Sequence, residues 1–484
     1  MKIILISSLI IVGCFIGVIL LIMTEKLNRA IAALSGAVIT YFVLIFIEKL
    51  NFSVIVDILF GSSEDNYVNL HSLILIIAMM MIVSISYEAG VFQFLAIKLI
   101  ILSKGKPIRL LIINCTMTVL ISAVLNNILT VIILIPLTIT ISRILNIDPS
   151  PYILTQAILV NIGGSLFSIS SIPNILITTY AKISFNEFFL NVGLISLIIF
   201  VFTLLFFILL YKNELKIPEE GAKVLKEFNV WNLVQNKRLL YESMGILITL
   251  ILMLIIVPSY IITADMIALT LSLVLIIISK LEPKEIISKI DFELIFYLLG
   301  IFIIAGALEI VGVTGLLGMM LLNISGDNFL IQMLIILWFS AFLSSSIDNI
   351  PITKVLIPVI GTMSEQGNPE NKKLFFYSLA IGANWGDNLT PMGDNILVMN
   401  IAEQNKRPIT FKQFFKLGFI TTIYQLTIVS VILILLYEFM FGIFLSTAVI
   451  LIILLLYTIN KYAPQKIRIK INNVSNKLRN AIIK

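Results

Sequence analysis

The sequence is poor in charge and nearly lacks the side chains that carry enzyme chemistry. Charged residues make up 12% of the 484, whereas about a quarter of an ordinary globular domain is charged, so most of this chain does not face water. The single histidine, His71, excludes a His-based zinc cluster, and Cys14 and Cys115 lie in apolar segments, as packing residues do. No P-loop, zinc-protease or nucleophile-elbow motif occurs. These absences argue against an enzyme, an intramembrane hydrolase included, and against a resident cofactor.

Long apolar runs are abundant instead. Hydrophobic residues make up 59% of the chain and gather in runs of roughly 17 to 25 residues, the length that a helix needs to cross about 30 Å of hydrocarbon. The first run lacks the small-residue cleavage pattern of a signal peptide, so we expect it to be retained as a helix. We predict an all-α polytopic membrane protein with eleven full spans. The spans cover residues 2–23, 28–48, 69–87, 152–180, 185–212, 241–260, 265–279, 291–308, 375–400, 413–438 and 441–460.

Two further apolar stretches, 107–145 and 327–362, are each too long for one span and carry polar residues at their middle. Irregular backbone at membrane depth is tolerated only where it is buried in protein or lines a watery cavity. We therefore predict that each stretch forms a re-entrant helical hairpin whose polar tip lies inside the protein.

Basic residues predict the orientation, because cytoplasmic loops of membrane proteins carry an excess of Lys and Arg. The tail 461–484 holds seven Lys or Arg and no acidic residue. The net charge of +6 is thus a topology signal and gives no reason to expect a nucleic-acid partner. We predict a multi-pass protein of the cytoplasmic membrane with its N-terminus outside and its C-terminus inside. The segments assigned to the cytoplasmic side are 26–29, 104–109, 143, 212–238, 280–289, 406–412 and 461–484.

An internal repeat carries most of the functional information. The middle of the first hairpin, with Asn126 and Asn127, aligns with the middle of the second, with Asp348 and Asn349, at a constant offset of 222 residues (348 − 126, 349 − 127). The same offset pairs three further positions: Pro136 with Pro358, Asn69 with Asp291, and Gly90 with Gly312.

A second pair of polar interruptions follows the hairpins, at 161–174 and 384–395. Both are rich in Gly, Pro, Asn and Ser, so we expect the helices 152–180 and 375–400 to be discontinuous there. Each half contributes five full spans, and an odd number inverts the second half relative to the first. Paired broken helices in inverted repeats mark the binding site of secondary transporters. The four interruptions should therefore converge on one cavity.

The hairpin tips together with the segments Gly163-Gly164 to Pro173-Asn174 and Gly382 to Gly393 resemble the ion transporter superfamily over nearly the whole chain, from about Glu25 to Gly418. This superfamily includes arsenical pump membrane proteins, a branch of sodium/proton antiporters, melanosomal P-type proteins and citrate-transporter-like permeases. The resemblance implies two inverted repeats, often in a dimer, that work by an elevator-like movement. The expected division is 1–212 for the first repeat, 213–240 for a cytoplasmic connector, 241–438 for the second repeat, and 439–484 for a C-terminal span and basic tail.

The resemblance also implies which residues bind the substrate and a coupling ion. The tip residues are Asn126, Asn127, Asp348 and Asn349, and the same motifs contain Thr130 and Thr353. The unwound-helix residues are Gly163, Gly164, Ser165, Asn174, Asn388, Thr390, Gly393 and Asn395. A coupling Na⁺ is expected at Asp348, Asn349, Asn388 and Thr390, and H⁺ is the alternative coupling ion.

Charged side chains inside the second half add to this set. Asp348, Asp387 and Asp394 each cost on the order of 2.5 to 3.5 kcal/mol if unpaired at mid-bilayer, so they are functional candidates. Lys354 has two interpretations: it extends toward the outer interface, or it is a fixed cation that faces Asp387 or Asp394 and replaces a coupling Na⁺.

We therefore predict a secondary active transporter of a small ion, since no ATPase motif is present. Tip and helix amides favour a small anion, a carboxylate or an oxyanion, and the segment Asn388-Leu-Thr390-Pro391 favours arsenite-type efflux. Sodium/proton antiport is the rival hypothesis. Two differences weaken this hypothesis. This chain has Asn126 where the antiporter branch has Asp, and it has Ser170-Ser171-Ile172-Pro173-Asn174 where that branch has Gly-Asp-Pro-Pro-Asn. A gated channel on the same scaffold is the other alternative. The expected partners are the ion, the lipid bilayer and a second copy of the chain.

Overall fold

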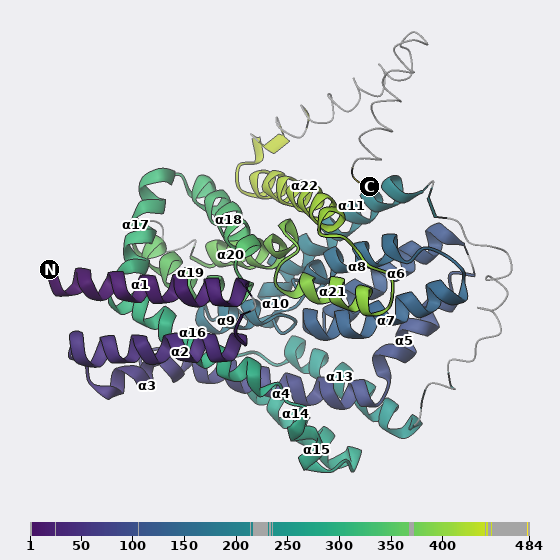
Figure 1. Ribbon diagram of the computed structural model, residues 1–484, viewed down its shortest axis with the longest axis horizontal. Helices are drawn as coiled ribbons and strands as arrows, with labels where there is room; N and C mark the ends of the chain where they lie inside the picture. Colours follow the sequence, from purple (N-terminus) through teal and green to yellow (C-terminus); the bar gives the residue numbers. More distant parts are fainter. Residues whose placement is uncertain are drawn as a thin grey trace, which may run out of the picture.

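The computed structural model describes residues 2–24, 26–104, 106–212, 214–215, 231, 234, 236–366, 372–440, 442–443, 447 and 482, and Figure 1 shows its helices. Every regular element in these ranges is a helix. Long apolar runs fold this way because a bilayer offers no water to the backbone, and a helix satisfies its backbone groups within one segment. The predicted all-helical class is confirmed.

The helices follow one another in two series, before and after the segment around residue 225. The first series comprises α1 (Lys2–Met23), α2 (Arg29–Phe42) continued by the π-helical turn η1 (Val43–Ile47), α3 (Phe52–Phe60), α4 (Val68–Glu88), α5 (Val91–Ile101), α6 (Pro107–Ser122), α7 (Asn127–Ile144), α8 (Ser150–Gly163), α9 (Ile172–Tyr180), α10 (Phe185–Phe188), η2 (Phe189–Gly193) and α11 (Leu194–Tyr211). The second comprises α13 (Lys237–Ile256), α14 (Ala264–Ser279), α15 (Pro283–Ser288), α16 (Phe292–Ile310), α17 (Val313–Ser325), α18 (Phe329–Ser346), α19 (Asn349–Gln366), α20 (Lys372–Gly386), the 3₁₀ turn η5 (Asp387–Leu389), α21 (Asp394–Gln404) and α22 (Phe411–Tyr437).

Nine helical stretches in the described part of the chain are long and apolar enough to cross a membrane. Seven coincide with predicted full spans, and the other two, α7 and α18, are arms of the predicted hairpins. Their outer surfaces are apolar: Leu209 and Ile256, for example, are 63% and 71% exposed. Such side chains face lipid at low cost, so the chain is an integral multi-pass membrane protein.

Helix starts recur along the chain with one spacing. α18 begins 222 residues after α6 (329 − 107), α19 begins 222 after α7 (349 − 127), and α20 begins 222 after α8 (372 − 150). Packing partners recur as well, since α6 packs on α8 as α18 packs on α20, and α2 packs on α16 as α14 packs on α4. The offset of the sequence motifs is therefore also the offset of these three helix starts. In the α2–α16 and α4–α14 contacts, each series contributes one helix.

Figure 1 shows two groups of helices. α2, α3, α4, α14 and α15 lie along its lower side, whereas α8, α11, α18, α20 and α22 lie in its upper part. In each series a membrane-length helix packs on a predicted hairpin or interrupted helix, since α4 packs on α9 and α16 packs on α19. The predicted hairpins and interrupted helices therefore border the packed spans from both series.

Several short helices were not predicted, namely α3, α5, α15 and α17. They have 6 to 13 residues, too short for a span, and the sequence analysis left their segments between elements. α5 and α17 begin directly after Gly90 and Gly312, whose φ angles are 76° and 80°. Glycine adopts positive φ without steric cost, which explains why the repeat has glycine at both turns.

Some predicted boundaries differ from the structure or fall outside its described part. The span 265–279 corresponds to α14, whose 16 residues are fewer than a full crossing usually needs. The span 241–260 corresponds to α13, which begins earlier, at Lys237, because Asn236 accepts a hydrogen bond from the Leu239 N–H and caps the helix there. The connector 213–240 and the region 439–484, with the span 441–460, lie largely outside the described residues.

Candidate functional site

Asparagine and aspartate begin the returning arm of each predicted hairpin. Asn126 caps α7, its side-chain oxygen accepting from the Leu129 N–H at 2.8 Å. Asp348 precedes α19, and one of its oxygens accepts from the Ile350 N–H at 3.2 Å. The first N–H groups of a helix have no partner within the helix, and these short polar side chains satisfy them. The sequence therefore ends one helix and starts the next at each tip.

The helix interruptions have a common internal brace. α8 ends at Gly163 and α9 begins at Ile172, and the Asn174 Nδ2 donates back to the Gly164 carbonyl at 2.8 Å. In the second series the Asn395 Nδ2 donates to the Asp387 carbonyl at 2.9 Å. These residues correspond at offsets of 221 (395 − 174) and 223 (387 − 164). Both interruptions lie where the sequence analysis predicted discontinuous helices.

Each hairpin packs closely on the interrupted helix of its own series. The Ser122 hydroxyl donates to the Val160 carbonyl at 2.6 Å, and the Ser344 hydroxyl donates to the Ala383 carbonyl at 2.6 Å. A Cβ at Gly386 would lie 2.2 Å from a carbonyl oxygen of α18. Glycine is therefore required for this approach, and hairpin and interrupted helix form one packed unit.

Both tips and the first interruption line one cavity, whose volume of about 30 Å³ leaves room for one or two water molecules. The helices α7, α9 and α19 all begin at its wall, and helix N-termini carry partial positive charge. We name it the tip cavity. Its lining residues are Arg29, Asn126, Asn127, Ile128, Ser171, Ile172, Pro173, Leu294, Asp348, Asn349 and Ile350.

Arg29 is a lining residue that the sequence analysis missed, having assigned it to topology alone. Its guanidinium is 3.2 Å from the Glu293 carboxylate and 3.5 Å from that of Asp291, and it lies 5.8 Å from the Tyr297 ring centre. The Tyr297 hydroxyl donates to Asp348 at 3.3 Å. Arg29 thus joins the start of α2 to the second tip. Its position at the start of a span was the one available signal, and that position is equally typical of an orientation residue.

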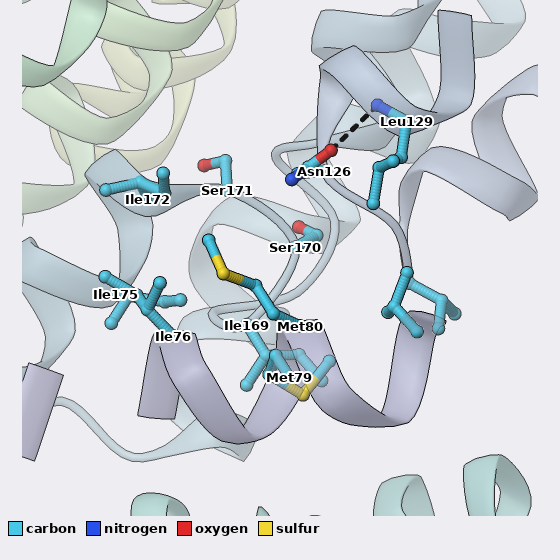
Figure 2. Close-up of a pocket in the computed structure, with 12 residues that line it drawn as sticks. Ile76, Met79, Met80, Asn126, Leu129, Ile169, Ser170, Ser171, Ile172 and Ile175 are labelled. Atoms are coloured by element: carbon cyan, nitrogen blue, oxygen red, sulfur yellow. Dashed lines mark hydrogen bonds between the residues drawn. The ribbon is translucent and has the colours of Figure 1, made fainter. Parts of the chain in front are cut away.

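A second cavity adjoins the first tip (Figure 2). Asn126 lies at its edge with its oxygen bonded to Leu129 and its nitrogen on the side of Ser170 and Ser171. Methionine and isoleucine side chains, among them Met79 and Met80, form the rest of the wall shown in Figure 2. Asn126 and Ser171 line both cavities, so the first tip has a polar side and an apolar side.

A chain of buried amides links the two series behind the tips. The Asn127 Nδ2 donates to the Asn161 Oδ1 at 2.6 Å, and the Asn161 Nδ2 donates to the Asn388 Oδ1 at 2.8 Å. A second contact runs from the Asn384 Nδ2 to the Asn174 Oδ1 at 2.7 Å. Sequence analysis missed Asn161 and Asn384 as site members, although both belong to the motifs that it aligned.

The remaining predicted residues divide between the tips and the interruptions. The Thr390 hydroxyl donates to the Ser345 carbonyl beside the second tip, and Thr130 donates to the Asn126 carbonyl at 2.9 Å. Thr353 is buried, and its hydroxyl has no hydrogen-bond partner within the described residues. The Ser165 hydroxyl accepts a hydrogen bond from the Trp385 indole at 3.0 Å, and the Asp387 carboxylate accepts one from Ser344 at 3.4 Å. Gly164 lies against Asn127. Gly393 has a positive φ of 59°. The side chain of Asp394 lies outside the described part.

The four predicted Na⁺ ligands do not share one cavity. Asp348 and Asn349 line the tip cavity, whereas both polar atoms of the Asn388 amide are hydrogen-bonded, to Asn161 and to the Ile158 carbonyl, and Thr390 donates to Ser345. No group of three His, Cys, Asp or Glu side chains in the searched part of the chain could hold a metal ion. Asp348 and Asn349 are the predicted pair that the structure brings together.

Lys354 lines neither of the two cavities. Its ammonium donates to the Asn69 Oδ1 at 2.6 Å and lies 4.7 Å from the Phe302 ring centre. Of the two predicted partners, Asp387 is not paired with Lys354, because α19 turns Lys354 toward α4 and α16, and the side chain of Asp394 lies outside the described part. Asn69 is the second residue of α4, so the lysine extends toward a helix end.

Two opposed polar tips, two interrupted helices and a shell of membrane-length helices define a multi-pass membrane transporter. The model of the citrate transporter family (CitMHS) matches residues 19–375 and also 262–471. The chain belongs to this family, and the resemblance noted from its motifs is confirmed.

Relatives with similar sequences include proteins named as a membrane protein and as transporters. A 46 kDa membrane protein of Mycobacterium leprae is 27% identical over 429 residues, which cover 88% of this chain and 98% of that protein. An uncharacterized transporter of Synechocystis sp. is 26% identical over 442 residues, covering 86% and 95%. The P protein of Mus musculus is 25% identical over 502 residues, covering 86% of this chain and 59% of that protein.

Proposed function

We propose that this protein is a secondary active transporter that moves a small anion, a carboxylate or an oxyanion, in exchange or symport with Na⁺ or H⁺. The observation that carries the proposal is the tip cavity, where Arg29 and the N-termini of three helices meet. Each helix N-terminus carries roughly half a positive charge, and those of α7 and α9 have only neutral caps, so their convergence favours an anion. Citrate-type carboxylates lead the candidates, and arsenite-type efflux stays as a second oxyanion hypothesis.

Asp348 is our candidate for the residue that binds the coupling ion. Its carboxylate lines the tip cavity, and with Asn349 it offers the oxygen ligands that Na⁺ prefers, or a site for a proton. Sodium/proton antiport is less favoured, because the equivalent residue of the other tip is the neutral Asn126. The proposal includes no cofactor beyond the coupling ion.

The architecture that we propose is a pair of inverted repeats with re-entrant hairpins. Arms of 18 residues, such as α7, extend about 27 Å at about 1.5 Å per residue, so a tip can lie deep in the bilayer. Arg29 and Leu294 lie near the starts of α2 and α16, ends that the basic residues assign to the cytoplasm. The cavity thus lies nearer the cytoplasmic side. We also propose a homodimer in the cytoplasmic membrane, with the N-terminus outside and the C-terminus inside.

Transport of a polycarboxylate requires the tips to separate, because the cavity of about 30 Å³ holds one or two water molecules at most. A carrier that opens and closes fits this geometry better than a continuous pore. The gated-channel alternative predicts unitary currents, whereas a carrier predicts saturation and exchange.

The test is uptake of radiolabelled citrate, and separately of arsenite, into proteoliposomes with an imposed Na⁺ or pH gradient. We expect uptake of the anion to be saturable and to be accelerated when the same anion is present on the opposite side of the membrane. Asn126→Ala should reduce the uptake rate at least tenfold. Asn323→Ala, an exposed asparagine on α17, is the matched control. Gradient-driven Na⁺ flux without any anion, or single-channel currents, would contradict the proposal.

A further inference from the structure

A large apolar cavity lies outside the candidate site, between α5, α6 and α13. Its volume is about 540 Å³, within the range of roughly 300 to 1,000 Å³ typical of small-molecule sites. Its lining is apolar except for Lys98, and it draws on α5 residues such as Leu95, on α6 residues such as Leu120, and on α13 residues such as Leu247. An occupant must therefore be mostly hydrocarbon.

The cavity opens toward the lipid-facing surface. Leu102, Leu120 and Ile248 line it and are 56%, 55% and 55% exposed. Because these residues belong to three segments of a membrane-embedded chain, their exposed faces meet lipid. A molecule can enter from the bilayer without crossing water.

The one polar side chain of the lining belongs to a cationic and aromatic cluster. Lys98 lies 5.5 Å from the Phe94 ring centre, and Phe94 packs on Trp231 at 4.9 Å between ring centres. Lys237, the first residue of α13, lies 5.1 Å from the Trp231 ring centre, and the Tyr241 ring centre lies 6.4 Å from that of Trp231. Tryptophan, tyrosine and lysine gather in this way at membrane–water interfaces.

The charge at this end suits an anionic headgroup. No ion pair to Lys98 or Lys237 occurs within the described residues. The loop between α5 and α6 adds Lys104 and Lys106, and the positive-inside argument assigns this side to the cytoplasm, whose leaflet carries the anionic lipids.

We propose that this cavity binds an anionic phospholipid, with one acyl chain between α5, α6 and α13 and the phosphate at Lys98. Val124 lines both this cavity and the one shown in Figure 2, and it lies two residues before Asn126. A bound acyl chain therefore packs directly against the first tip. The lipid site does not depend on which ion the protein transports.

Native mass spectrometry tests this lipid site. The delipidated full-length protein is titrated with phosphatidylglycerol or phosphatidylcholine. Ile248→Trp fills the cavity from α13 and should weaken phosphatidylglycerol binding at least tenfold. Leu252→Trp is the matched control, since Leu252 lies one turn further on α13, is similarly exposed at 49%, and is not a lining residue. Lys98→Gln should weaken binding about fivefold, the contribution of one lysine near an anionic surface. Lys412→Gln should not, because Lys412 is exposed on α22, which contributes no residue to the lining of this cavity.

Leu120→Trp fills the same cavity from α6, so the test does not depend on the folding of Ile248→Trp alone. Equal binding by wild type and by both cavity-filling variants would overturn the site. Equal affinity for phosphatidylcholine and phosphatidylglycerol would overturn the headgroup assignment. Because binding is read without transport, a failure here is distinct from a failure of the proposed anion transport.

Discussion

Asn161→Ala probes the amide chain that joins the two series. Asn161 is 2% exposed, accepts from Asn127 at 2.6 Å and donates to Asn388 at 2.8 Å. Alanine leaves the Asn127 Nδ2 and the Asn388 Oδ1 buried without these partners. Each buried unpaired group costs about 1–3 kcal/mol, so the variant should be less stable by about 2–6 kcal/mol.

Thermal unfolding of the purified protein, together with anion uptake in proteoliposomes, measures this effect. Asn191→Ala is the control, because the Asn191 amide donates within its own helical stretch, to the Glu187 carbonyl. The double variant of Asn161 and Asn388 should be less destabilised than the two single variants added together, since it removes both members of one bond. If Asn161→Ala unfolds no earlier than Asn191→Ala, or if the double variant is additive, the amide chain does not hold the interruptions together.

Three further predictions test separate parts of the structure. Arg29→Gln should raise the KM for the anion by about tenfold or more, the effect of losing one charge-assisted hydrogen bond. Arg29→Lys should restore part of the lost affinity. An unchanged KM in Arg29→Gln would remove Arg29 from the site. Lys354→Ala and Asn69→Ala should both lower thermal stability and leave the Na⁺ dependence of uptake unchanged, because they remove the two partners of one hydrogen bond outside the tip cavity. Loss of Na⁺ dependence in the lysine variant alone would restore its role as a fixed cation. Gly386→Ala should destabilise by about 1–3 kcal/mol because its Cβ would meet the backbone of α18, whereas Gly245→Ala, with nothing within 4 Å, should behave as wild type in the same unfolding assay.

The spans and the interruptions could be predicted because their causes are local. A run of apolar residues long enough to cross the bilayer becomes a helix wherever it packs, and polar residues such as Asn126 and Asp348 inside such a run need partners. The constant offset added nonlocal information. It predicted that the two tips correspond to each other, and in the structure both tips line one cavity.

The partners of individual side chains could not be predicted, because they depend on depth and on packing between series. Arg29 begins a span and signals orientation, but only the packing of α2 on α16 brings it beside the second tip. Lys354 lies near Asp348 in sequence, yet it bonds to Asn69, 285 positions away. The short helices α5 and α17 were missed because no apolar periodicity distinguishes a short helix from a loop.

At both tips a short polar side chain accepts a hydrogen bond from the start of the returning helix, but the two side chains differ in charge. We propose that this difference gives the two tips different tasks. At the second tip, Asp348 accepts from the Ile350 N–H and from Tyr297, so its own carboxylate already uses the positive start of α19. The starts of α7 and α9 at the same cavity have only neutral caps, from Asn126 and Ser171. An incoming anion should therefore bind nearer the first tip, while a cation binds at the second. On this argument, substitutions at Asn126 change which anion is carried, whereas substitutions at Asp348 change its coupling to the ion gradient.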